Sequence, residues 1–107
     1  MAEASLNTED IGDWISFHRK CKEVFGFPDF YGENMDAWID CLSYLDEGDG
    51  MSRFHLNKGE MLLIEITDTK HFKDRVPEIF DALVECSALV NFKYERSVLA
   101  LVFTDRR

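Results

Sequence analysis

Two aspartates, Asp36 and Asp40, stand four residues apart in a stretch rich in aromatic residues. This spacing places both carboxylates on one face of a helix, one turn apart. Such a pair has two chemical uses, which are acid–base catalysis and pairing with the cationic groups of a binding partner. Like charges at this spacing destabilise a helix by roughly 0.2–0.5 kcal/mol. Helix stability therefore does not explain the pair, and docking onto a basic surface is favoured.

Catalysis is the weaker interpretation of this pair. Exposed positions on one helix provide no cleft that would raise the pKa of one carboxyl group. The chain contains no G-x-S-x-G, Walker or zincin motif, and no histidine stands near Cys41 in the sequence to activate it. We therefore expect no enzymatic activity. The simplest alternative to a binding site is an ordinary solvated helix face.

Periodicity predicts the helices that would position the pair. Asn34 is expected to cap a helix over residues 34–45, in which Met35, Trp38, Ile39 and Leu42 form the apolar stripe. An earlier helix is expected to start after Asp13 and to end at Gly26. Its predicted inner stripe consists of Trp14, Phe17, His18, Cys21 and Phe25. A later helix should begin at Pro77, and the sequence does not fix where it ends. Its predicted face consists of Val76, Ile79, Phe80, Leu83 and Ser87.

Three apolar stretches predict strands, at residues 4–6, 61–66 and 98–103. The second is a nearly continuous apolar run, which is typical of a buried parallel strand. A further helix is expected around residues 71–76, and the polar residues 46–60 are expected to form a loop. Strands separated by helices predict an α/β fold with a small parallel sheet packed with helices.

Composition limits the classes of function that remain. The chain has 107 residues, which predicts a single domain over residues 1–107, and its net charge is −9. Direct nucleic-acid binding is not expected, because neutralising phosphates requires an excess of Lys and Arg. An acidic surface favours electrostatically steered association with a basic partner.

The cysteines and histidines indicate no disulfide framework and no metal site. The chain has an odd number of cysteines, and the three residues, Cys21, Cys41 and Cys86, lack the spacing of zinc ligands. Residues 46–50 are acidic but lack the calcium-loop pattern. No signal peptide or membrane-spanning run is apparent. We therefore expect a cytoplasmic protein that uses neither a cofactor nor a metal.

The run Tyr-Gly-Glu-Asn-x-Asp-Ala-x-x-Asp-Cys-Leu at residues 31–42 closely resembles the barstar family of ribonuclease inhibitors. About the first 45 residues align with the family in one register, whereas the second half matches only in its pattern of elements. The matches before the run include Leu6, Asn7, Glu9, Ile11, Phe17, His18, Lys22, Glu23, Phe25 and Pro28. The resemblance implies a three-stranded parallel sheet packed with helices.

The resemblance also implies which acids would bind the partner. The family uses the aspartates that match Asp36 and Asp40 as its inhibitory acids, which enter the ribonuclease active site where substrate phosphates would lie. The resemblance implies a third acid on the later helix, for which Glu85 is the best candidate, and Asp81, on the same face one turn earlier, is the alternative.

Four further residues are expected to surround these acids: Phe30, Tyr31, Ile39 and Tyr44. Phe30 keeps the ring of a family tyrosine and lacks its hydroxyl. Ile39 replaces an interfacial tryptophan, while Trp38 stands on the buried stripe. These departures keep the acidic centre and alter its rim.

The resemblance thus predicts an immunity protein that inhibits a basic, barnase-like ribonuclease or related bacterial toxin in a one-to-one complex. The alternative is a barstar-fold regulatory or adaptor protein whose basic partner is not a nuclease. A small hydrolase using the acids is a third, weaker interpretation.

Overall fold

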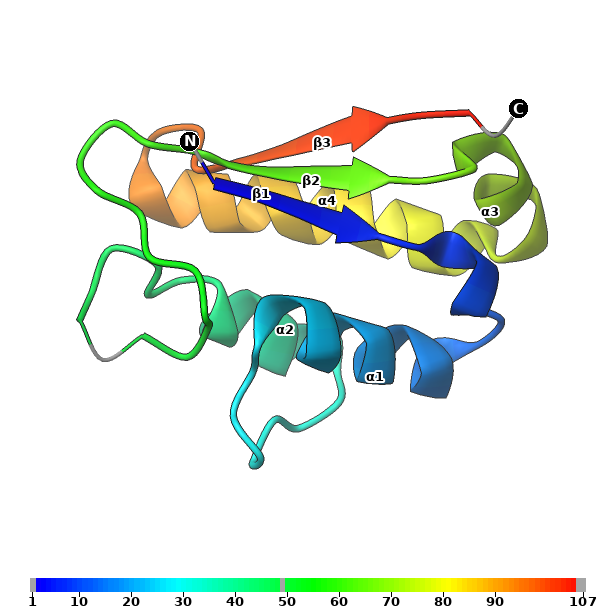
Figure 1. Cartoon of the computed structure of the whole chain (residues 1–107), viewed down its shortest axis with the longest axis horizontal. Coiled ribbons are helices and arrows are strands. Elements are labelled where there is room, and N and C mark those ends of the chain that lie inside the picture. Colours follow the sequence, from blue (N-terminus) through cyan, green and yellow to red (C-terminus); the bar gives the residue numbers. More distant parts are fainter. Residues whose placement is uncertain (1, 49, 106–107) are drawn as a thin grey trace.

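A three-stranded parallel sheet forms one layer of the protein, with strand order β1-β2-β3 (Figure 1). The computed structural model describes residues 2–48 and 50–105. The strands are β1 (Ala2–Leu6), β2 (Leu62–Ile66) and β3 (Leu99–Phe103). All three coincide with stretches predicted as strands, and β1 is longer than expected. The predicted α/β fold with a small parallel sheet is confirmed.

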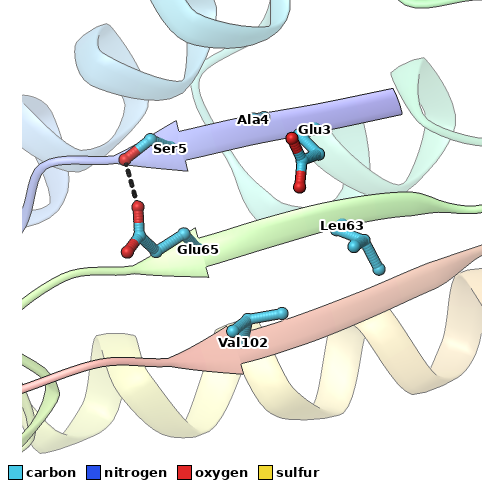
Figure 2. Close-up of a pocket in the computed structure, with 6 residues that line it drawn as sticks. All are labelled: Glu3, Ala4, Ser5, Leu63, Glu65 and Val102. Atoms are coloured by element: carbon cyan, nitrogen blue, oxygen red, sulfur yellow. Dashed lines mark hydrogen bonds between the residues drawn. The ribbon is translucent and has the colours of Figure 1, made fainter. Parts of the chain in front are cut away.

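Within residues 2–48 and 50–105, helices cover only one face of the sheet. Side chains of β2 alternate, with Leu62, Ile64 and Ile66 buried, and Leu63 and Glu65 only half-buried. Helices α1, α2 and α4 lie on the same side of the sheet in Figure 1. Figure 2 shows the opposite face, where Ser5 donates a 2.9 Å hydrogen bond to Glu65. The second strand is parallel as predicted, and its buried side chains all lie on the face that the helices cover.

Helix α1 (Trp14–Phe25) packs on β1 and begins and ends where predicted. The Asp13 carboxylate accepts a 2.8 Å bond from the backbone of Ser16, and Gly26 ends the helix in the left-handed conformation at φ 67°. Four of the five predicted stripe residues are buried. Trp14 is the exception at 39% exposure; it lies in the first turn, and its ring stacks on that of His18.

Helix α2 (Met35–Cys41) is shorter than the predicted span of residues 34–45. Asn34 caps it as expected, with its side-chain oxygen 2.8 Å from the backbone nitrogen of Ala37. The Ser43 hydroxyl donates to the carbonyl of Ile39, while the Ser43 backbone N–H bonds to Asp40 instead. A side-chain hydroxyl that takes a helical carbonyl competes with continuation of the helix. The hydrogen bond from the Ser43 hydroxyl therefore helps to end α2 at Cys41, before the predicted residue 45.

Helices α3 (Thr69–Arg75) and α4 (Pro77–Tyr94) complete the layer beside the sheet. Pro77 opens α4 as predicted, and α4 packs on β3, α2 and α3. A 3-10 turn, η1 (Thr8–Asp10), was not predicted; it is tied to α3 by hydrogen bonds from the Arg75 guanidinium. The described part of the predicted 46–60 loop forms no helix or strand.

Candidate functional site

Helix α2 presents Asp36 and Asp40 to solvent. Both aspartates are exposed, while Trp38, Cys41 and Leu42 on the opposite face are buried. This division follows from the helical period, which puts residues four apart on one face. The amphipathic pattern therefore fixes the orientation of the two carboxylates.

No cation within residues 2–48 and 50–105 forms a salt bridge with Asp36 or Asp40. Elsewhere on the surface, for example, Lys20 pairs with Asp10 at 2.8 Å. The negative charge of α2 is therefore available to a binding partner. Carboxylates in this state suit pairing with Arg, Lys or protonated His.

A groove of about 540 Å³ runs between α2 and α4. It is lined by Asp36, Ile39 and Asp40 from α2 and by Leu89, Phe92 and Lys93 from α4. Ile39 is half-buried, so its exposed part contributes apolar surface beside the acids. The acidic pair is thus one wall of a partly apolar groove.

The charges of surface acids affect the pKa of two buried thiols. Burial raises the pKa of Cys86, and the charges of Glu85 and Asp36 raise it further. Burial and the charge of Asp40 similarly raise the pKa of Cys41. Glu85 on α4 and Asp36 on α2 therefore both act on the Cys86 thiol. Asp81 is exposed, one turn earlier on α4.

The segment before α2 holds two aromatic neighbours in opposite environments. Phe30 is 77% exposed, whereas Tyr31 is only 6% exposed. The Tyr31 hydroxyl lies 2.6 Å from Nδ1 of His18, and its ring packs on Phe27. Burial raises the pKa of Tyr31 and lowers that of His18. Phe30 is therefore free to touch a partner, while Tyr31 anchors the segment that carries it.

Tyr44 lies beyond the end of α2 and is 39% exposed. Because α2 ends at Cys41, Tyr44 belongs to the following turn and not to the helix face on which it was predicted. Its neighbour Leu45 is buried. The backbone N–H of Leu45 donates a 2.8 Å hydrogen bond to the hydroxyl of Tyr94, which fixes the position of this turn relative to α4.

A model of the family described as Barstar (barnase inhibitor) matches residues 1–104. The chain belongs to the barstar family. Both α2 and α4 fall within the matched range, so the match extends well beyond the first 45 residues that carried the resemblance. The family assignment made from the motif is confirmed.

In this barstar-family chain, sequence reasoning missed Leu89, Phe92 and Lys93. The predicted face of α4 stopped at Ser87, because the end of the helix was not fixed. A signal was present: Leu89, Phe92 and Lys93 are spaced three and four residues apart, off the buried stripe through Leu83 and Val90. Once the helix is known to reach Tyr94, this spacing gathers the three side chains on a second face.

Among the described residues, no three His, Cys, Asp or Glu side chains are placed to hold a metal ion. No helix in the described part of this barstar-family chain is long and apolar enough to cross a membrane. The three cysteines are buried free thiols.

Proposed function

We propose that this chain is an immunity protein that inhibits a basic bacterial ribonuclease by stoichiometric, one-to-one binding and performs no chemistry itself. The observation that carries the proposal is the exposed pair Asp36 and Asp40, without cationic partners within the described residues, on the capped helix of a barstar-family chain.

The physical basis of the proposed inhibition is charge mimicry. A ribonuclease holds its substrate phosphates with Arg, Lys and His side chains, and carboxylates form strong charge-assisted hydrogen bonds with the same groups. Asp36 and Asp40 would occupy the phosphate positions and exclude RNA. Glu85 would add a third negative charge from α4.

The residues on α2 and in the segments that flank it support a specific partner. Ile39 on α2, Phe30 before it and Tyr44 after it offer exposed or half-exposed apolar surface, while the buried Tyr31 anchors the segment that carries Phe30. Phe30 and Ile39 depart from the family's tyrosine and tryptophan. These departures favour a target whose rim differs from that of barnase.

The test is titration of basic bacterial ribonucleases, including barnase and the ribonuclease encoded nearest to the gene. We expect the activity of at least one enzyme to fall linearly to an equivalence point at one chain per nuclease. The double variant Asp36→Asn/Asp40→Asn keeps the side-chain shapes, removes both charges and should lose inhibition.

The matched control is Glu3→Gln/Asp74→Asn, which removes two exposed negative charges on β1 and α3. It should inhibit like the unaltered chain. A panel in which every ribonuclease stays fully active, or equal inhibition by both double variants, would contradict the proposal.

A further inference from the structure

The outer side of α4 carries two strongly exposed apolar side chains. Phe92 is 80% exposed and Leu89 is 52% exposed. Among the exposed large apolar side chains of the described residues, Phe92 and Phe30 have the highest exposed fractions. Single exposed apolar residues are ordinary, whereas apolar side chains that adjoin one another at a groove often mark interaction sites.

Phe92 and Leu89 line the same groove as the acids. Asp36 and Asp40 form its α2 wall, and Ile39 adds apolar surface on that wall. Phe92 also lines a second hollow on its other side, with Ala88 and Asn91, so its ring stands between the two hollows. A partner seated on the acidic pair therefore has Leu89 and Phe92 within reach of its neighbouring side chains.

We propose that the α2–α4 groove is the apolar half of the nuclease-binding surface, and that Leu89 and Phe92 hold an apolar or aromatic side chain of the ribonuclease. This inference rests on the proposed function and names two specificity-determining residues on α4. The occupant is a side chain that stands beside the cations paired with Asp36 and Asp40.

The charges on the groove favour this occupant. The α2 wall carries two carboxylates, which attract a cationic neighbour and repel an acidic one. Lys93 on the α4 wall repels a cation inside the groove, and the carboxylates across the groove repel an acid, so an apolar side chain fits there best. A second copy of this chain fits poorly, because each copy has a net charge of −9 and both would bring acids to the contact.

The experiment measures the dissociation constant and the rate constants of Phe92→Ala and Leu89→Ala with the most tightly inhibited ribonuclease. We expect each variant to bind on the order of tenfold more weakly, mainly through faster dissociation, as for a truncated apolar contact at an interface. This deficit should persist at high salt, whereas the deficit of Asp36→Asn/Asp40→Asn should shrink as salt screens the charges.

The control is Ile15→Ala, which truncates a 58% exposed side chain on α1 outside the groove. It should bind like the unaltered chain. As an independent readout, a photo-reactive phenylalanine at position 92 should crosslink to the ribonuclease, and one at position 15 should not.

Failure of this inference and failure of the proposed function give different results. If no ribonuclease is bound, both are overturned. If the double aspartate variant loses binding while Phe92→Ala and Leu89→Ala bind like Ile15→Ala, only the groove is overturned. Self-association of the free chain that Phe92→Ala abolishes, with nuclease binding unchanged, would assign the groove to a second copy and also overturn the inference.

Discussion

Asp36 and Asp40 are exposed side chains on a face of α2 that contributes little to the core. Their mutual repulsion is a small cost to the helix, of roughly 0.2–0.5 kcal/mol. Stability and binding should therefore respond differently when one of them is removed.

Asp40→Ala tests this separation. We expect the free energy of unfolding to change by less than about 0.5 kcal/mol, because the site is exposed and repulsion with Asp36 is relieved. Binding should weaken by at least about 2 kcal/mol, because a cation of the partner loses its counter-charge in a desolvated contact. Thermal melts and titrations against the inhibited ribonuclease measure the two effects. Unfolding of the variant, or binding equal to that of the unaltered chain, would show that Asp40 is structural or irrelevant.

The buried side chain of His18 should make the free energy of unfolding depend on pH. Burial lowers its pKa in the folded chain, and the charge of Glu33 opposes this only in part. The unfolded chain therefore binds a proton more readily, so stability is full above the unfolded pKa of about 6.5 and is lost as the pH falls through the lowered folded pKa. Urea unfolding at pH 7.5, 6.5 and 5.5 should show this loss.

His18→Gln should flatten this pH dependence between pH 7.5 and 5.5, whereas His55→Gln, at an exposed position, should leave it intact. An unchanged slope in His18→Gln would mean that other groups cause the loss. The two variants thus separate the buried histidine from the general titration of the surface.

At the scale of the elements, two leucines near the contact between α2 and α4 allow a buried position to be compared with an exposed one. Leu42 is fully buried directly after α2, whereas Leu89 is 52% exposed on α4. Leu42→Ala should lower the free energy of unfolding by roughly 2–5 kcal/mol through lost contacts and a cavity. Leu89→Ala should lower it by less than about 0.5 kcal/mol. Chemical unfolding of both variants provides the comparison, and equal losses would contradict the assignment of the core.

The sequence predicted the starts of α1, α2 and α4 and the end of α1 at Gly26, but not the ends of α2 and α4. Asp13, Asn34 and Pro77 are start signals whose chemistry is local, and all three stand where expected. The end of α2 depends on the Ser43 hydroxyl competing for a carbonyl, and the end of α4 at Tyr94 follows no glycine or proline signal. The groove was missed for this reason, because it exists only where α4 continues beside α2.

At the scale of the whole molecule, the family motif and the order of strands and helices were sufficient to predict the parallel sheet. They were not sufficient to predict that the helices of the described residues cover only one face of the sheet, because apolar residues in a strand do not state how many layers pack on it. Leu63 and Glu65 on that face, half-buried in the hollow with Glu3 and Val102, had no sequence signal of their own.

The net charge of −9 belongs to this scale as well. We expect the association rate with a basic ribonuclease to fall as salt rises, because screening over about 10 Å at 0.1 M weakens long-range steering. Stopped-flow measurements from low to high salt test this, with the Asp36→Asn/Asp40→Asn variant showing a shallower dependence. Association rates that stay constant across the salt range would contradict electrostatic steering.

The shortness of α2 has a consequence for the design of peptides that imitate the proposed inhibitor. A helix of seven residues has no stability of its own in water, where isolated helices shorter than about 12–15 residues are marginal. A synthetic peptide copied from residues 34–42 would therefore sample many shapes and display its carboxylates in none of them for long. The proposed binding surface therefore cannot be transferred as a short peptide, and any miniature would have to reproduce the support that α4 gives to α2.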